Sequence, residues 1–406
     1  MAFNIALSGL NAASKDLEVT ANNIANTGTA GFKGSRAEFA ELFNSAGRNL
    51  SATAIGSGVR LADVAQQFGA GNVENTGNSL DFAISGDGFF TMRDGKGYSY
   101  TRAGAFNQDN NGYVVNASGQ HLQVFPPAGN GFDTSTMVDL QLTNAQSAAK
   151  ATGTVEMSLN LPSDATAPTS TPFNPTDALS YNQATPFTAY DSLGGTHSGT
   201  IYYVKGAAPN TWSAYLYVDG VSAGAPQTLS FDTSGALATP AGGKLNFPAL
   251  AVSPGADPLT LSIDVNKVTQ FGNAYALSSI NQDGYPSGTL SGIDVSSEGV
   301  VQAKYSNGQA VSLGQLALAN FNNLQGLRQL DNTGWAASFD SGTAIMGVAG
   351  QGTFGAVQSG ALEASNTADL TAQLVNMIKA QRNYQANAQV ISTDNQLTQT
   401  IINIRN

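Results

Sequence analysis

A regular apolar stripe runs along each end of the chain. Near the N-terminus, steps of four and three residues connect Phe3, Leu7, Leu10, Ser14, Leu17, Ala21 and Ile24. Near the C-terminus, the same steps connect Leu370, Leu374, Met377, Gln381, Tyr384, Ala388 and Ile391, and the stripe is widened or continued by Ile378, Leu397 and Ile401. A spacing of 3.5 residues keeps such side chains facing a neighbouring helix, as in a coiled coil. The pattern therefore predicts one long helix at each end, and Asn366 followed by Asp369 resembles a capping box at the start of the second.

The middle of the chain has a different pattern. From about residue 70 to residue 345, short apolar alternations are interrupted by turn dipeptides such as Asp87-Gly88, Asn111-Gly112 and Asp283-Gly284. Asn-Gly and Asp-Gly favour the left-handed conformations of two-residue hairpin turns. Stretches such as GTIYYV (199–204) and WSAYLYV (212–218) are rich in the β-branched and aromatic residues that strands prefer. We therefore predict a fold that is mainly β with α-helical termini, the β part being mostly antiparallel.

Proline-bearing stretches divide the β region. Five prolines lie among small polar residues between 162 and 186, and AVSPGADP follows at 251–258. Such stretches favour semi-rigid connectors. We predict nested, discontinuous domains. Both termini form a coiled-coil-like core, and an outer β domain is inserted within an inner β domain. The expected ranges are 1–33 and 366–406 for the helical core, 34–70 and 346–365 for linkers, 71–145 and 276–345 for the inner β domain, and 146–275 for the outer β domain.

Charge is sparse and acidic. Charged residues make up 11% of the 406 residues, against about 25% in an average soluble protein. The formal net charge is −11, and the 17 lysines and arginines are scattered. This argues against nucleic-acid binding, which needs clustered cations, and against docking on anionic lipid.

The residues needed for catalysis or metal binding are also scarce. There is no cysteine, which excludes disulfides and thiolate sites. The two histidines, His121 and His197, each lie alone in a β or turn context, so we expect surface or hairpin positions rather than a triad or a zinc site. We therefore predict no enzymatic activity, no cofactor and no metal. The N-terminus also lacks the basic and apolar segments of a secretory signal, so any export is expected without a cleaved signal.

Asparagines are concentrated at the end of the first predicted helix. In ANNIANTGTAGFKGS (21–35), Asn22, Asn23 and Asn26 surround Ile24. Asparagine is a poor residue for a helix interior because its side chain competes for backbone hydrogen bonds. We expect Gly28 to end the helix in the left-handed conformation.

Both ends of the chain resemble known signatures. ANNIANTGTAGFK is similar to the N-terminal signature of the bacterial flagellar axial proteins, the family of rod, hook and hook-associated subunits, and residues 361–406 resemble the matching C-terminal signature. The similarity continues through SGLNAAS (8–14), GNSLDFAISGDGFF (77–90), TPFTAYDSLGG (185–195), NQDGYPSGTL (281–290) and LGQLALANFNNLQGL (313–327). It is weakest between about 200 and 275. Because rod subunits lack a large outer insert, region 146–275 favours the hook subunits within this family.

The resemblance implies a structural polymer rather than an enzyme. Hook subunits self-assemble into a hollow, curved, flexible tube outside the cell surface, a universal joint that transmits torque from rod to filament. The implied partners are further copies of the chain, the distal rod protein, the hook cap, the hook–filament junction protein and the flagellar type III export apparatus. The alternative within the family is a distal rod or hook–filament junction subunit. An adhesin or carbohydrate-binding β protein would leave both terminal helices unexplained.

Stripes and resemblance together predict an assembly interface. Heptad stripes more often form an intramolecular core, but these two lie over 300 residues apart and no other helix of similar length is predicted. In a tube of packed helices the asparagines would fix register by hydrogen bonds to neighbours, and Phe32 would anchor the chain as it leaves the helix. The predicted interface residues are Phe3, Leu7, Leu10, Leu17, Asn22, Asn23, Ile24, Asn26, Phe32, Leu370, Leu374, Met377, Ile378, Tyr384, Ile391, Leu397 and Ile401.

Overall fold

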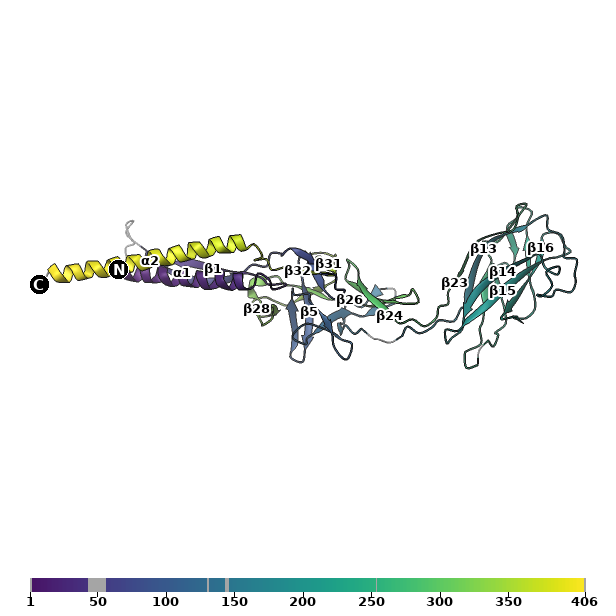
Figure 1. Cartoon of the computed structure of the whole chain (residues 1–406), viewed down its shortest axis with the longest axis horizontal. Helices are drawn as coiled ribbons and strands as arrows, with labels where there is room; N and C mark the ends of the chain where they lie inside the picture. The colour runs from purple at the N-terminus through teal and green to yellow at the C-terminus, as the bar shows by residue number, and fades with distance from the viewer. Residues whose placement is uncertain (1, 43–55, 130, 143–145, 253, 405–406) are drawn as a thin grey trace. The chain divides into compact units, whose positions relative to one another are not determined.

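The computed structural model describes residues 2–42, 56–129, 131–142, 146–252 and 254–404 (Figure 1). The chain divides into two compact units. Unit 1 comprises Met1–Thr143, Gly292–Lys304 and Ala310–Asn406, and unit 2 comprises Asn144–Ser291 and Tyr305–Gln309. The predicted boundary at 145/146 adjoins residues 143–145, which lie outside the described residues. The predicted class, mainly β with a helix at each end, is confirmed.

The two long helices belong to unit 1. Helix α1 spans Ala2–Ala25 and helix α2 spans Leu370–Ile404. They lie side by side in opposite directions, and α2 extends beyond the N-terminal end of α1 (Figure 1). The capping-box prediction is wrong in detail: Asp369, directly before α2, accepts a hydrogen bond from the Ala372 amide at 3.1 Å. The Asn366 side chain instead contacts the N-terminal segment, accepting from the Gly34 amide at 2.8 Å.

A 13-stranded sheet forms the β part of unit 1. Its main path runs β24-β25-β26-β9-β5-β6-β29-β28. These strands span Leu290–Val295 (β24), Val300–Tyr305 (β25), Ala310–Leu316 (β26), His121–Phe125 (β9), Phe89–Asp94 (β5), Gly97–Thr101 (β6), Gly334–Ala336 (β29) and Arg328–Gln329 (β28). Off this path lie β7 (Asn107–Gln108), β8 (Val114–Val115), β12 (Val138–Asp139), β27 (Leu318–Asn320) and β30 (Ile345–Gly347). A short hairpin pairs β10 (Pro127–Ala128) with β11 (Gly131–Phe132), and one 3-10 turn, η1, spans Leu324–Gly326. Phe82, Phe90 and Leu122 are buried in the main hydrophobic core of the β part of unit 1.

The segments predicted as linkers contain paired strands. Strand β1 (Ser35–Glu41) pairs antiparallel with β2 (Val59–Gln66), and this hairpin packs on α1; residues 43–55 of the predicted linker lie outside the described residues. In the second segment, β31 (Ala356–Ser359) pairs with β4 (Phe82–Ser85), and β32 (Ala361–Glu363) pairs with β3 (Val73–Asn75). These pairings satisfy backbone groups that an open linker would leave to water.

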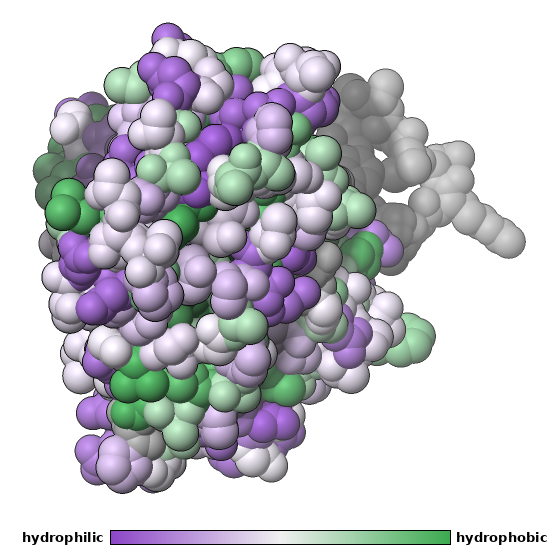
Figure 2. Space-filling model, turned by 90° about the vertical axis from the view of Figure 1, so that its right-hand side faces the viewer, coloured by the Kyte–Doolittle hydropathy of each residue, from purple (hydrophilic) through white to green (hydrophobic). Residues whose placement is uncertain are grey.

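Unit 2 consists of two sheets that share one core. One sheet contains β14 (Gln183–Tyr190), β15 (Thr196–Lys205), β16 (Thr211–Val218), β17 (Val221–Ser222), β18 (Gln227–Phe231) and β19 (Leu237–Thr239). The other contains β13 (Thr154–Pro162), β20 (Lys244–Asn246), β21 (Ser262–Asp264), β22 (Thr269–Phe271) and β23 (Ala276–Gln282). Val155 and Ile263 of one sheet and Trp212 of the other are buried in the same cluster. The face of unit 2 in Figure 2 is mostly polar or near neutral, with apolar residues gathered toward its lower left.

Two features of unit 2 differ from the sequence-based expectation. Strand β23 was predicted in the inner domain, which was expected to resume at residue 276, but it lies here because it pairs antiparallel along β13. In addition, β13 pairs parallel with β21 and β22, so the sheet is mixed. Both result from long-range strand pairing, which turn dipeptides do not encode.

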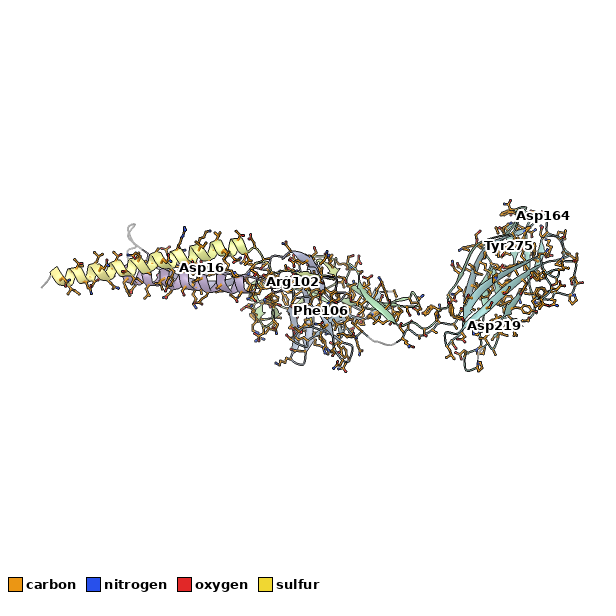
Figure 3. The ribbon with its side chains drawn as sticks, in the orientation of Figure 1. Asp16, Arg102, Phe106, Asp164, Asp219 and Tyr275 are labelled. Carbon is orange, nitrogen blue, oxygen red and sulfur yellow. The ribbon has the colours of Figure 1, made fainter. Side chains whose placement is uncertain are left out.

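His197 lies on the β14–β15 hairpin, one of the two expected positions, but it is buried rather than at the surface. Its side chain is 7% exposed, with Nδ1 2.6 Å from Asp219 Oδ2 and Nε2 3.1 Å from Asp191 Oδ2. Figure 3 labels Asp219 at this site. Burial acts to lower the pKa of His197, but the hydrogen bonds and charges of Asp219 and Asp191 outweigh it, so the pKa is raised. A histidine with both ring nitrogens on carboxylates is stabilised in its charged form.

We expect unit 2 to lose stability as the pH rises above about 6.5. The raised pKa of His197 means that its stabilising contribution is complete below the unfolded value of about 6.5 and is lost as pH rises through the folded pKa. The pKa of Asp219 is lowered, chiefly by its hydrogen bond with His197, so its contribution is lost only on acidification below about 3.8. Thermal unfolding from pH 5 to pH 9 should show this slope, and His197→Gln should flatten it. An unchanged slope in His197→Gln, with His121→Gln as control, would contradict the assignment.

Candidate assembly surface

Small side chains are buried along the two helices within one chain. Ala6 and Ala13 of α1 and Ala380 of α2 are 4%, 6% and 0% exposed. A Cβ atom added to Gly9 would lie 2.6 Å from Oδ1 of Asn387 on α2, so the helices approach closely at this glycine. Sequence reasoning missed these residues, although alanine and glycine at positions 6, 9 and 13 have helical spacing and could have indicated a close contact.

Packing within the chain leaves much of the predicted apolar stripes exposed. The exposed members of the predicted interface are Phe3 (39%), Leu7 (40%), Leu370 (48%), Leu374 (48%), Ile378 (48%), Tyr384 (40%), Leu397 (57%) and Ile401 (66%). Leu10, Leu17, Ile24, Met377 and Ile391 are half-buried. Val375, Val390 and Ile402 extend the exposed set on α2, at 47%, 46% and 56%. A continuous series of large exposed apolar side chains is typical of a surface that binds another protein.

The asparagines make hydrogen bonds within their own chain. Asn23 is 6% exposed; its Nδ2 donates to the Ser35 carbonyl at 2.8 Å, and its Oδ1 accepts from the Ser35 amide at 2.9 Å. Asn23 thereby fastens the start of β1 to the end of α1. Asn26 Nδ2 donates to the backbone carbonyl of Asn22 at 3.0 Å and to the side-chain Oδ1 of Asn22 at 3.1 Å. The Asn22 side chain is exposed, so of the three it is the most accessible to a neighbouring copy.

Asn22→Ala and Asn23→Ala are expected to have different effects. Asn23→Ala removes both bonds to Ser35 and leaves its partly buried backbone amide and carbonyl without these partners, which costs about 1–3 kcal/mol in the single subunit. Asn22→Ala should leave subunit stability within about 0.5 kcal/mol, because the side chain is exposed. Any loss of polymer length or helical order in Asn22→Ala would then report its contact with a neighbour. Chemical denaturation of the subunit and electron microscopy of the polymer measure the two effects, and an Asn22→Ala polymer like the parent would contradict its register role.

The chain leaves α1 through a turn that differs from the predicted one. Gly28 is not among the glycines with positive φ; the left-handed residue is Gly31, with φ of 68°. A Cβ atom on Gly31 would lie 2.4 Å from the amide nitrogen of Ala103, so this position requires glycine for space as well as conformation. Phe32 follows and is 7% exposed, which places it inside its own chain. The expectation for Gly28 is therefore wrong, because the helix ends three residues earlier, at Ala25.

A buried cluster of charges lies just after this turn. Lys33 Nζ is 2.6 Å from Glu363 Oε1, and Arg102 Nη1 is 3.2 Å from Glu363 Oε2. The side chains of Lys33, Glu363 and Arg102 are 1%, 0% and 4% exposed. Glu363 Oε1 also accepts from the Gly71 amide at 2.8 Å, and Arg102 Nη2 donates to the Gly86 carbonyl at 2.7 Å. The cluster thus joins segments from residues 33, 71, 86, 102 and 363, and Figure 3 labels Arg102 where the helices meet the β part of unit 1.

Electrostatics explains why this cluster depends on one carboxylate. Burial lowers the pKa of both Lys33 and Arg102, because the low-dielectric interior disfavours their charged forms. The charge of Glu363 and its hydrogen bonds oppose that shift in each case. Without the carboxylate, two buried cations would repel each other. Sequence reasoning missed this cluster, although Lys33 and Glu363 are the charged residues within AGFK and ALEAS of the two signature regions.

A groove runs between α1, the start of β1 and the start of α2. It has a volume of about 340 Å³, and its lining includes Asp16, Asn23, Arg36, Asn366 and Lys379. Burial raises the pKa of Asp16, which Figure 3 labels on α1. The described residues contain no group of three His, Asp or Glu side chains placed to hold a metal ion. Among the described helices, none is long and apolar enough to cross a membrane.

Family models match four segments of the chain. Residues 3–33 match the flagella basal body rod protein model, and residues 83–169 match the flagellar hook protein FlgE/F/G D1 domain. Residues 160–285 match the flagellar basal body protein FlaE D2 domain, and residues 358–404 match the flagellar basal body rod FlgEFG protein C-terminal model. The first match covers almost all of α1, and the last match covers all of α2.

Whole-chain relatives show the same similarity. The flagellar hook protein FlgE of Salmonella typhimurium is 40% identical over 100% of both chains. Those of Rhizobium meliloti and Borreliella burgdorferi are 35% and 31% identical over 98% of this chain and 97% and 98% of their own lengths. The crystal structure of Helicobacter pylori flagellar hook protein FlgE2 covers 71% of this chain and 100% of its own, with a TM-score of 0.54 and 14% identity, which supports the fold.

Proposed function

The chain belongs to the flagellar hook protein family and is a structural subunit of the bacterial flagellar hook, and we propose that it polymerises through the exposed stripes of α1 and α2. In this proposal, neighbouring copies cover the apolar side chains that the helices leave exposed. The product is a hollow, curved and flexible tube that acts as a universal joint between rod and filament.

One observation carries the proposed mode of assembly. Ala6, Ala13 and Ala380 are buried along the two helices, whereas eight large apolar residues of the stripes stay 39% to 66% exposed. Burying apolar area is the main favourable contribution to association between proteins. The seventeen residues of the predicted interface remain the proposed contact set, except that Asn23, Asn26 and Phe32 have their observed contacts inside their own chain.

The domain arrangement is part of the same proposal. We propose that the terminal helices form the core of the tube, and that the β part of unit 1 and then unit 2 form outer layers. The match of residues 160–285 to a D2 domain and of residues 83–169 to a D1 domain supports separate β layers. The large inserted β domain that forms unit 2 also favours a hook subunit over the alternative of a distal rod or hook–filament junction subunit.

Partners and location follow from the family. A hook subunit is located in the flagellum and assembles with copies of itself. We propose that this chain also contacts the distal rod protein, the hook cap and the hook–filament junction protein. We further propose that the flagellar type III apparatus exports it without cleaving a signal, and that it has no enzymatic activity.

Electron microscopy of the purified full chain under polymerising conditions tests this function. Curved hollow tubes are expected, with a chain limited to residues 71–360 remaining unassembled because it lacks both stripes. Straight and rigid tubes would favour a rod subunit instead. Unassembled full chain under conditions in which a related hook protein polymerises would contradict the proposal.

A further inference from the structure

Phe339 is a large apolar residue that its own chain leaves fully exposed. It lies beyond the end of β29 in unit 1, and its exposed fraction is 100%. The other large apolar residues with notable exposure range from 36% to 67%, so each keeps part of its surface covered. A fully exposed phenylalanine is unfavourable in water unless a partner covers it.

Hydrogen bonds hold the loop that carries Phe339. Ser338 Oγ donates to the Gly326 carbonyl at 2.5 Å and accepts from the Asp340 amide at 3.0 Å. Ser341, which is 1% exposed, accepts at its Oγ from the Ser338 amide at 2.8 Å. Asn323 Nδ2 donates to the Asp340 carbonyl at 3.0 Å. The residues on both sides of Phe339 are therefore tied to the body of unit 1, and the ring is presented by an ordered loop.

A shallow apolar hollow lies elsewhere on unit 1. Its volume is about 200 Å³, and small side chains line it, among them Ala30, Ala103, Ala105, Ala117, Thr101 and Thr333. Alanine and threonine methyl groups form a surface against which an aromatic ring can pack. No large side chain is among the lining residues, and the volume is of the size that a single ring can use.

The ring and the hollow lie at opposite ends of one short strand. Thr333, in the lining of the hollow, directly precedes β29, whereas Phe339 follows that strand by three residues. Six residues span at most about 20 Å. A ring and a hollow at separate places on one surface can pair reciprocally about a two-fold axis, which gives a closed dimer, or head to tail, which repeats as an open helical polymer. A tube built from this chain requires the head-to-tail arrangement.

We propose that Phe339 of one copy packs into the hollow lined by Ala103, Ala105 and Ala117 of a second copy of this chain. This inference rests on the proposed function, because it assigns one contact between the β parts of successive subunits in the polymer. It adds a contact outside the helical core, on a surface that the sequence analysis did not identify.

Because the chain has no cysteine, disulfide trapping in the full-length protein gives a direct test. Tubes formed by Phe339→Cys/Ala117→Cys, then oxidised, are expected to yield a ladder of covalent multimers on a denaturing gel. Tubes from an equal mixture of the two single variants should yield dimers only, since each subunit then has one thiol. Phe339→Cys/Ala105→Cys provides a second pair across the same hollow.

A second measurement does not depend on thiols. Phe339→Ser should raise the critical concentration for polymerisation at least tenfold, and Phe339→Leu should raise it less. Val311→Ser is the matched control, since Val311 is 45% exposed in the same unit, and should leave it within twofold. Tubes without a ladder, or a Phe339→Ser critical concentration like that of the parent, would overturn this inference and leave the proposed function intact. Dimers from Phe339→Cys alone would also overturn this inference. Failure of the parent chain to form tubes would overturn both this inference and the proposed function.

Discussion

A chain with Leu374, Ile378 and Ile401 all replaced by lysine is expected not to form tubes at concentrations at which the parent polymerises. These residues are 48%, 48% and 66% exposed on α2, so about half of each side chain remains to be buried by a neighbour. At roughly 1.5–3 kcal/mol for complete burial, the three together contribute about 3 kcal/mol per subunit. That corresponds to roughly a hundredfold rise in critical concentration, to which the desolvation of three ammonium groups adds. Sedimentation and electron microscopy across a concentration series measure it.

The matched control places the same charge on other exposed positions of the helix. Thr371, Gln385 and Gln396 are exposed polar residues of α2 outside the predicted stripe. Replacing these three by lysine adds the same +3 charge without removing apolar surface. Both variants should keep the circular dichroism and thermal unfolding of the β units. Equal loss of assembly in the two variants would mean that net charge, and not burial of the stripe, controls polymerisation.

Glu363→Ala is expected to lower the stability of unit 1 by about 3–5 kcal/mol, the usual cost of removing one partner of a buried ion pair. The substitution leaves Lys33 and Arg102 buried without their carboxylate, at side-chain exposures of 1% and 4%. At about 2–4 °C per kcal/mol for a unit of this size, its unfolding temperature should fall by roughly 6–20 °C. Differential scanning calorimetry of the full chain measures the shift.

Two further variants make this result specific. Glu74 lies on β3, which pairs with the strand that carries Glu363, and its side chain is exposed. Glu74→Ala removes the same charge and should change stability by no more than about 0.5 kcal/mol. In a double-mutant cycle of Lys33→Met and Glu363→Gln, we expect a coupling free energy above about 1 kcal/mol, since the two side chains are in contact at 2.6 Å. Additive effects would show that the ion pair does not stabilise the fold.

The two experiments separate two requirements for building the polymer. The stripe variant should fold and fail to assemble. Glu363→Ala should instead weaken the attachment of β32 to the segments around Lys33 and Gly71 before assembly begins. If Glu363→Ala still forms a polymer at low temperature, its subunits should make the same helix contacts with each other as in the parent polymer, because the stripes are unchanged.

The candidate site was predicted unevenly for physical reasons. Stripe residues such as Leu374 and Ile401 were found because large apolar side chains at a 3.5-residue spacing mark one face of a helix. Asn23 was singled out as an unusual residue in a helix. Its hydrogen-bond partner, Ser35, was not predicted, because the β1–β2 hairpin that packs on α1 brings Ser35 to it. Phe339 was missed because one phenylalanine in a polar loop has no periodicity to distinguish it.

The mainly β class with a helix at each end, the two apolar stripes and the flagellar family could all be predicted from the sequence. These depend on local periodicity, turn dipeptides and terminal motifs, each of which is contained in a short stretch. The tertiary structure shows in addition that Ala6, Ala13 and Ala380 are buried along the helices while eight large apolar stripe residues remain exposed. It alone brought Glu363 to Lys33, across 330 positions, and paired β23 with β13. Burial and ion pairing depend on which distant segments meet in space, and a linear pattern does not specify that.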